Sequence, residues 1–230
     1  MKQEEFNYRF SGLKMFADHA KHFPRAKEEV KKQTEILENF ISYFPSFETS
    51  FQPVKVKKDA PKIVREMSAA SSNFNIGPLS TVAGAIAEVS AQEIKKSGSK
   101  LALVENGGDI FIASLAKKIT VGIFAKNKAF LDLAFEVHPE EAPIAICSSS
   151  GKMGRSMSLG RADLACVVSR SAFVADAGAT YLGNLIKEEK NLQAALDKIA
   201  GKKDVLGALA IKDNKIGMAG KLPKIVRLNP

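Results

Sequence analysis

The sequence predicts an α+β fold in which a central mixed or antiparallel β-sheet packs against helices. Apolar residues recur at helical spacing in the first hundred residues, form extended runs in the middle of the chain, and return to helical spacing near its end. Helices that flank a block of strands, instead of alternating with them, are typical of this class. A chain of 230 residues, 45% of them hydrophobic, can bury one sizeable core. We therefore expect a single domain over residues 1–230, with a strand and helix layer over 1–58 and a core over 59–230.

The N-terminal layer begins with a strand that we expect over residues 8–16. Apolar residues at helical spacing then predict a helix over 26–44, which Pro45 ends. A second helix is expected over 60–71, with Asp59 as its N-cap. Each helix has one apolar face, which must pack against another part of the molecule.

Three further helices are expected over 78–96, 175–187 and 191–200. Gly98 follows the first of them and is typical of a residue that ends a helix. Alanine and glycine residues near the start of that helix leave room for another backbone or a ligand to approach closely.

Extended apolar runs predict the sheet, and the last two of them form a terminal hairpin around Asp213 and Asn214. The expected strands cover residues 101–104, 110–113, 119–124, 131–137, 144–147, 164–168, 206–211 and 215–219.

Composition narrows the class of protein further. Cys147 and Cys166 each lie inside an apolar run, without the spacing of a zinc site, so we expect two reduced, buried thiols. No apolar run approaches the about 20 residues that a membrane helix needs, and the first residues do not resemble a signal peptide. We therefore expect a cytoplasmic protein that does not span a membrane.

The three histidines have no metal-ligating residues near them in the sequence, so we expect them at the surface or in loops. They are His19, His22 and His138.

The charge balance favours an anionic ligand. The 34 Lys and Arg residues exceed the 25 Asp and Glu residues and give a net charge of +9. This surplus suits nucleotides, phosphates or nucleic acid, and it also favours solubility alone. The basic residues occur as scattered pairs, without an arginine-rich arm or interleaved aromatic residues, so we expect no nucleic-acid partner.

A tight turn is expected where Asn106, Gly107, Gly108 and Asp109 join two apolar strands. Asparagine and glycine readily adopt the positive φ that such a turn requires. One interpretation is a simple hairpin turn, and the other is a ligand site where glycine lets the backbone come close to the ligand.

The segment after the strand over 144–147 collects hydroxyl groups, glycine and two cations. Its candidate ligand-binding residues are Ser149, Ser150, Gly151, Lys152, Arg155 and Ser156. Successive backbone N–H groups with nearby cations form a cradle for phosphate. The spacing is not that of a P-loop, and a solvated turn remains the alternative interpretation.

Asp176 and Thr180 stand at the start of the helix expected over 175–187, and a spacing of four residues places them on the same helix face. Carboxylate and hydroxyl oxygens are hard ligands that suit Mg²⁺ together with substrate phosphates. The alternative is structural: an aspartate that complements a helix N-terminus and a threonine packed within the helix.

In combination, these motifs resemble an uncharacterised prokaryotic family related to the ApbE-type FAD:protein FMN transferases. The resemblance extends over nearly the whole chain. It is carried by GPLSTVAGAIAE (77–88), VENGGDI (104–110), ICSSSG (146–151), SMSLGRAD (156–163), ADAGAT (175–180) and GN (183–184).

This resemblance implies a single ApbE-like domain that binds FAD or a related nucleotide with Mg²⁺ and transfers FMN to an acceptor protein. The residues that match the family's Gly-Gly-Asp turn and its Ser-Gly loop around FAD are Gly107, Gly108, Asp109, Ser150 and Gly151. The matches to its magnesium-binding acidic residue and threonine are Asp176 and Thr180.

Two departures from the transferases keep a second function open. Ala83 and Gly84 stand where the transferases carry a Lys-Gly pair, and the sequence has only Gly-Arg-Ala-Asp over 160–163 in place of their His-x-x-Asp-Pro-x-Thr-Gly segment. The leading hypothesis is binding of a flavin nucleotide with Mg²⁺ and cleavage or transfer at its pyrophosphate. The alternative is a non-catalytic module that binds a small anionic, phosphate-containing ligand.

Overall fold

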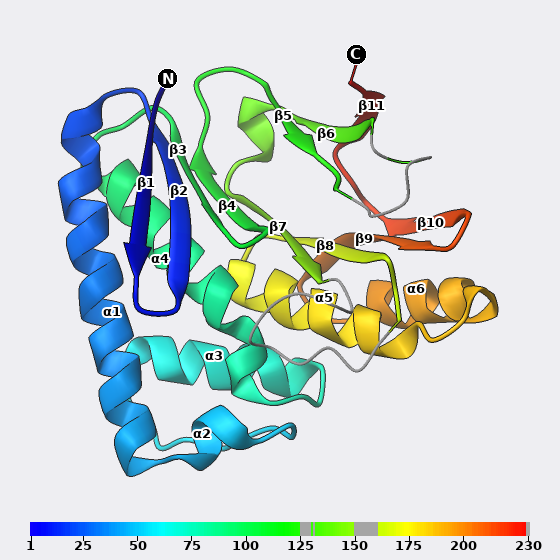
Figure 1. Cartoon of the computed structure of the whole chain (residues 1–230), viewed down its shortest axis with the longest axis horizontal. Helices are drawn as coiled ribbons and strands as arrows, with labels where there is room; N and C mark the ends of the chain where they lie inside the picture. Colours follow the sequence, from blue (N-terminus) through cyan, green and yellow to red (C-terminus); the bar gives the residue numbers. More distant parts are fainter. Residues whose placement is uncertain (125–129, 131, 150–160, 229–230) are drawn as a thin grey trace.

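Two antiparallel β-sheets and a layer of helices make up the structure, a computed structural model that describes residues 1–124, 130, 132–149 and 161–228 (Figure 1). This architecture confirms the expected α+β class. The large sheet contains β1 (Lys2–Tyr8), β2 (Ser11–Ala17), β3 (Ala102–Asn106), β4 (Asp109–Ser114), β7 (Ile144–Ser149), β8 (Leu164–Ser169), β9 (Val205–Lys212) and β10 (Lys215–Gly220), paired in that order. The small sheet contains β5 (Ile119–Gly122), β6 (Leu133–Val137) and β11 (Lys224–Arg227), with β6 in the middle.

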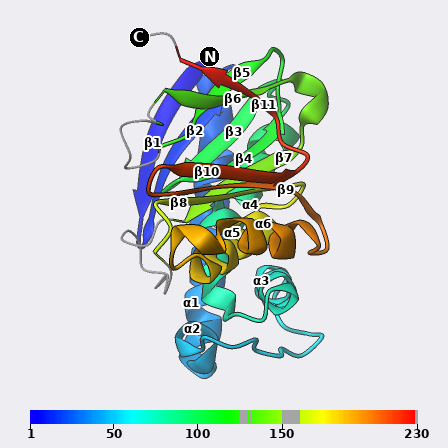
Figure 2. The ribbon, with the colours of Figure 1, turned by 90° about the vertical axis from the view of Figure 1, so that its right-hand side faces the viewer.

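The helices cover one face of the large sheet. The longer ones are α1 (Phe23–Tyr43), α3 (Lys62–Asn73), α4 (Val82–Lys96), α5 (Ala172–Leu185) and α6 (Leu192–Ala200); α2 (Ser46–Thr49) and the 3-10 helix η2 (Pro78–Thr81) are short. α4 packs on β3 and β4, α5 on β7 and β8, and α6 on β9 and β10. Figure 2 shows the small sheet on the opposite side of the large sheet from α5 and α6. None of the helices in the described part of the chain combines the length and the apolarity that crossing a membrane requires.

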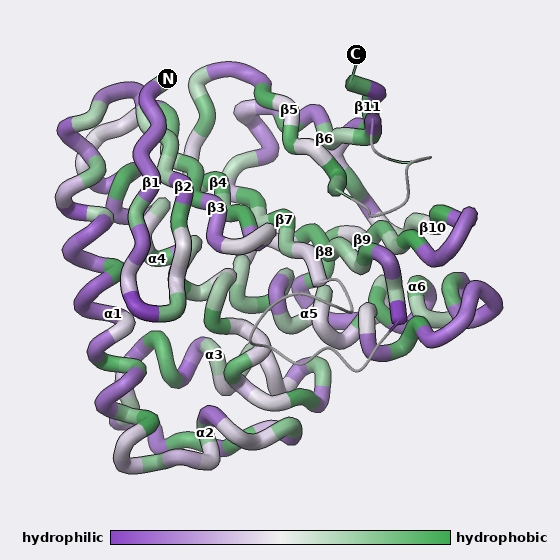
Figure 3. The backbone as a smooth tube through the Cα atoms, in the orientation of Figure 1, coloured by the Kyte–Doolittle hydropathy of each residue, from purple (hydrophilic) through white to green (hydrophobic). Residues whose placement is uncertain are grey.

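The large sheet therefore has an apolar core on each face. Successive residues of a strand point to opposite faces. Cys147 and Val167 belong to the core under the helices, whereas Ile146 and Cys166 belong to the core between the two sheets. Both cysteines are free and buried, as expected. Figure 3 shows hydrophobic residues following the central strands, whereas α1 is hydrophilic along much of its length.

The structure corrects the N-terminal and C-terminal elements. The segment expected as one strand over 8–16 is the hairpin of β1 and β2, whose turn contains Arg9 with φ of 52°. A non-glycine residue in this conformation gives no turn signal in the sequence. The expectation also missed β11, a four-residue strand that is held by pairing with β6.

The starts of two helices and the burial of one histidine differ from expectation. α3 begins at Lys62 with Pro61, not Asp59, as its N-cap. α5 begins at Ala172, so Asp176 lies in its second turn, not at its start. His22 is only 3% exposed, because its ring meets the end of α4, where Nδ1 lies 2.7 Å from Oγ of Ser97. That contact joins segments 75 residues apart, which local sequence patterns do not reveal.

Candidate functional site

A cavity of about 480 Å³ lies between the helices and the ends of β3, β4 and β7; we call it the acidic cavity. The predicted site residues that line it are Asn106, Gly107, Asp109, Ser149, Asp176 and Thr180. Gly108 belongs to the same turn but lines a different cavity. The remaining predicted residues, Ser150, Gly151, Lys152, Arg155 and Ser156, lie outside the described residues. The structure thus brings three separate motifs together, and what they bind stays a prediction.

The β3–β4 turn is a hairpin turn and also part of the cavity wall. Asn106 pairs with Asp109 across it, and the two glycines between them have φ of 63° and 103°. These conformations favour glycine because a Cβ atom would strain the backbone. The Asn106 side-chain amide donates a hydrogen bond of 3.1 Å to the carbonyl of Ala83, which ties the turn to α4.

Asp176 is held by a close approach of α4 and α5. Its side chain is 8% exposed, and Oδ2 accepts a hydrogen bond of 2.8 Å from the backbone N–H of Gly84. A Cβ atom at Gly84 would lie 2.4 Å from the carbonyl oxygen of Ala172 and 2.9 Å from Cβ of Asp176. The glycine therefore permits the helix contact that positions this carboxylate.

Glu88, one turn further along α4, fixes the start of α5. Its Oε2 accepts hydrogen bonds from the N–H of Ala172 at 2.6 Å and from the hydroxyl of Ser171 at 3.1 Å. These bonds satisfy backbone and side-chain donors at the helix N-terminus. Glu88 and Gly84 together set the position of α5 along α4, and hence the position of Asp176.

Burial makes both carboxyl groups costly to ionise, and the charge of Asp109 adds to this cost for Asp176. Burial raises the pKa of Asp109 from 3.8 to about 7, an effect that hydrogen bonds from Cys147 and Ser148 only partly offset. Burial, and then the charge of Asp109, raise the pKa of Asp176 well above its ordinary value. Burial also raises the pKa of the Cys147 thiol, so we assign it no nucleophilic role.

The charge of the acidic cavity was not apparent from the sequence. Its carboxylates are Glu38, Glu48, Asp109 and Asp176, and its described lining residues include no Lys, Arg or His. The chain as a whole carries +9, so the local charge is opposite to the overall charge. A carboxylate in such a place is stabilised by a proton or by a cation from outside the described lining.

Ser11 is a further lining residue that the sequence did not single out. It is 4% exposed, it lines the acidic cavity, and its hydroxyl has no hydrogen-bond partner in the described structure. Buried hydroxyl groups are normally paired, so an unpaired one facing a cavity is suited to a ligand. No sequence motif surrounds it.

The donor set fits a magnesium ion. Asp176 offers a carboxylate and Thr180 a hydroxyl from successive turns of one helix, and the second buried carboxylate, Asp109, lines the same cavity. Mg²⁺ prefers oxygen ligands and keeps sites for water and phosphate. A bound cation would remove the electrostatic cost that raises the pKa of both acids.

In the absence of metal, the free energy of unfolding is expected to fall as the pH rises from about 4 to 7. Asp109 has a folded-state pKa of about 7 and an ordinary value of 3.8, so between these values the folded protein holds a proton that the unfolded chain has lost. The resulting stabilisation is complete below the lower value and is lost as the pH rises through the upper one. Urea unfolding in EDTA across this range measures it.

Asp109→Asn is expected to make this profile less steep because the amide does not titrate, whereas Asp176, whose pKa is also raised, still contributes to it. The exposed Asp59→Asn serves as the matched control, since Asp59 lies outside the cavity. An equally steep profile in Asp109→Asn would show that this carboxyl group is not the source.

Comparison with known proteins identifies the family. A family described as AbpE bacteria matches residues 11–210. A UPF0280 protein from Methanothrix thermoacetophila is 37% identical over 228 residues, which cover 99% of this chain and 95% of that protein. A UPF0280 protein from Archaeoglobus fulgidus is 36% identical over 229 residues, covering 98% and 94% of the two chains.

Solved structures share the fold at low sequence identity. The apo form of flavinyl transferase ApbE from Pseudomonas stutzeri has a TM-score of 0.54 and 15% identity, covering 95% of this chain and 94% of that one. The ApbE protein from Thermotoga maritima has a TM-score of 0.55 and 10% identity, covering 99% and 97%. The chain therefore belongs to the family described as AbpE bacteria, a family with the ApbE fold.

Proposed function

We propose that the chain, as a single ApbE-like domain, binds FAD or a related nucleotide with Mg²⁺ in the acidic cavity and cleaves or transfers at the pyrophosphate. The observation that carries this proposal is the pair of buried carboxylates, Asp109 and Asp176, in a cavity whose described lining has no basic side chain. A nucleotide alone would be repelled there, whereas a nucleotide that enters with a divalent cation would not. The similarity of the fold to flavinyl transferase ApbE from Pseudomonas stutzeri supports flavin as the nucleotide.

Each group has a role in this proposal. Asp176 and Thr180 hold the metal, which neutralises negative charge on phosphate oxygens. The β3–β4 turn brings backbone close to the ligand, and Ser11 donates its unpaired hydroxyl to it. The sequence places Lys152 and Arg155 directly after the cavity-lining end of β7, and we assign them, with Arg161, to phosphate.

The alternative is a non-catalytic module that binds a small phosphate-containing ligand. Ala83 favours it, because this residue lines the acidic cavity where the transferases that the sequence resembles carry a lysine. A cation is therefore missing from this wall of the cavity. Transfer in the first case requires an acceptor protein, and the second case requires none.

Incubation with FAD separates the two functions. We expect the Mg²⁺-loaded protein to release AMP, together with FMN where water cleaves the pyrophosphate and without it where FMN is transferred to an acceptor. Chromatography measures the products, and we expect the EDTA-treated protein to release neither. Calorimetric titration with FAD, ADP and FMN under both conditions measures binding independently. Mg²⁺-dependent binding without product favours the module, and no binding of any of the three nucleotides contradicts the proposal.

A further inference from the structure

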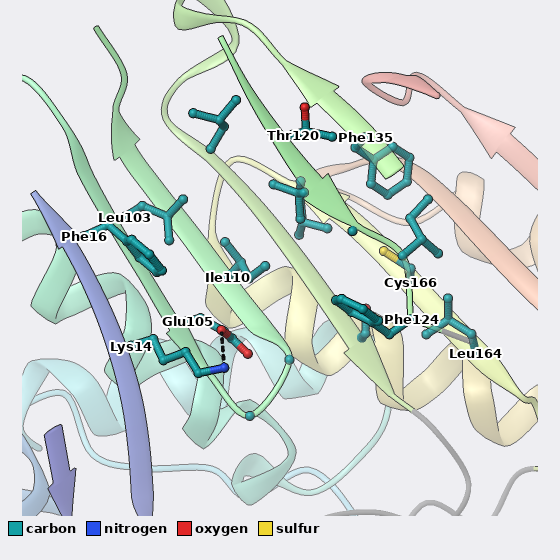
Figure 4. A pocket seen from close by; sticks show the side chains of 18 of the residues that line it. Lys14, Phe16, Leu103, Glu105, Ile110, Thr120, Phe124, Phe135, Leu164 and Cys166 are labelled. Carbon is teal, nitrogen blue, oxygen red and sulfur yellow. Dashed lines mark ion pairs between the residues drawn. The ribbon is translucent and has the colours of Figure 1, made fainter. Parts of the chain in front are cut away.

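A second cavity, of about 630 Å³, lies on the opposite face of the large sheet; we call it the inter-sheet cavity. Figure 4 shows side chains from both sheets pointing into it, including Leu103 and Ile110 from the large sheet and Phe135 from the small one. Its described wall is mainly aliphatic and aromatic. An ion pair between Lys14 and Glu105, with 3.6 Å between Nζ and Oε2, stands at the end nearest the β3–β4 turn.

The two cavities adjoin at the β3–β4 turn. Gly107 and Ser148 line both of them. Within β4, Asp109 lines the acidic cavity and the next residue, Ile110, lines the inter-sheet cavity, as the alternation of side chains along a strand requires. Two adjacent residues of β4 therefore line cavities on opposite faces of the sheet.

The turn itself leaves room for a ligand. A Cβ atom added at Gly107 or at Gly108 would meet nothing within 4 Å, so the described structure leaves the space beside these glycines open. By contrast, a Cβ atom at Gly84 or Gly77 would collide with neighbouring backbone. The two turn glycines thus border free space where the cavities adjoin.

The two cavities differ in chemistry. The acidic cavity offers carboxylates and hydroxyl groups, which suit a phosphate group that arrives with a metal ion, whereas the inter-sheet cavity offers apolar side chains, which suit a ring system. Each has a volume within the range of about 300–1,000 Å³ that is usual for small-molecule sites. A ligand with one phosphate-bearing part and one apolar ring part matches both.

We propose that the inter-sheet cavity binds the apolar ring part of the same ligand whose phosphate part lies in the acidic cavity, so that the ligand passes beside Gly107 and Ser148. This inference rests on the proposed function and extends it, because it selects nucleotides that carry a second ring system over simple nucleoside phosphates. Ile110 and its neighbours are then specificity-determining residues for the ring.

Ile110→Trp tests the inference by filling the cavity. Ile110 is only half-buried, so the larger side chain has room to enter the cavity from the sheet. With Mg²⁺ present, calorimetry is expected to show at least about tenfold weaker binding of FAD but a change of less than about twofold for ADP. The chain has no tryptophan, so the new side chain is also a single fluorophore, and we expect FAD but not ADP to quench it.

Two further variants complete the test. Ile225→Trp is the matched control, because Ile225 packs in the same inter-sheet core but does not line the cavity. Leu103→Trp fills the cavity from the neighbouring strand β3, where Leu103 is half-buried (Figure 4), and it replaces Ile110→Trp if thermal unfolding shows that the latter does not fold.

The outcomes separate this inference from the proposed function. If the unmodified protein binds FAD with Mg²⁺ and both cavity-filling variants bind it as tightly as Ile225→Trp does, the inference is wrong and the proposed function stands. If the unmodified protein binds neither FAD nor ADP, both are wrong.

Discussion

Asp176→Asn is expected to abolish the dependence of nucleotide binding on Mg²⁺. The amide keeps the oxygen that accepts the 2.8 Å hydrogen bond from Gly84, but it removes the charge that attracts a divalent cation. FAD and ADP should then bind with the same affinity in Mg²⁺ and in EDTA, at least about tenfold weaker than they bind the unmodified protein in Mg²⁺. Calorimetric titration measures both affinities.

The same variant is expected to be more stable than the unmodified protein when metal is absent at about pH 8. It removes one of two buried carboxylates that burial and mutual repulsion make costly to ionise. Thermal unfolding in EDTA measures the change, and the exposed Asp59→Asn serves as control for both experiments. Retained Mg²⁺ dependence in Asp176→Asn would exclude Asp176 as the metal ligand.

Gly84→Ala is expected to lower the free energy of unfolding by about 1–3 kcal/mol, the usual cost of overpacking a core. The added Cβ atom would lie 2.4 Å from the carbonyl oxygen of Ala172, a backbone atom, so α4 and α5 must move apart. This loss is expected even though alanine is by itself about 1 kcal/mol better than glycine in a helix. Urea unfolding measures it.

Gly201→Ala provides the matched control. A Cβ atom there would come no closer than 3.9 Å to the backbone oxygens of Asp197 and Lys198, which is ordinary contact. We also expect Gly84→Ala to weaken Mg²⁺-dependent binding of FAD, because separating the helices removes the hydrogen bond that holds Asp176. A Gly84→Ala protein as stable as Gly201→Ala would show that the helix contact is less tight than the structure describes.

Local sequence patterns were sufficient to predict those helices and strands whose formation depends on residues within the element or in its flanking turns. The hairpin of β3 and β4 was predicted because two extended apolar runs and the Asn-Gly turn between them are contiguous in the chain. The helices α1 and α4 were predicted within a few residues because their apolar residues recur at helical spacing. The β1–β2 hairpin and β11 were not, since a non-glycine turn and a four-residue edge strand depend on their pairing partners.

The candidate site, like the fold, was predicted only in part from the sequence. The sequence singled out Asn106, Asp109, Ser149, Asp176 and Thr180 by residue type, spacing and family resemblance, but it left a structural role open for each of their motifs. The structure brings these residues to one cavity because β4 pairs with β7 and because α4 and α5 approach closely. The spacing of these residues along the chain predicts neither the pairing of β4 with β7 nor the approach of α4 to α5.

What the sequence by itself determined was the fold class and most helices and strands, and it supplied the residues that we propose as ligands of a metal or a phosphate. Only the tertiary structure decided that Asp109 and Asp176 are buried together, that Ser11 faces the same cavity, and that an apolar cavity adjoins it at the β3–β4 turn. The physical reason is that periodicity and turn chemistry act between near neighbours in the chain. Burial, pKa shifts and cavities arise from groups that meet only when distant segments pack.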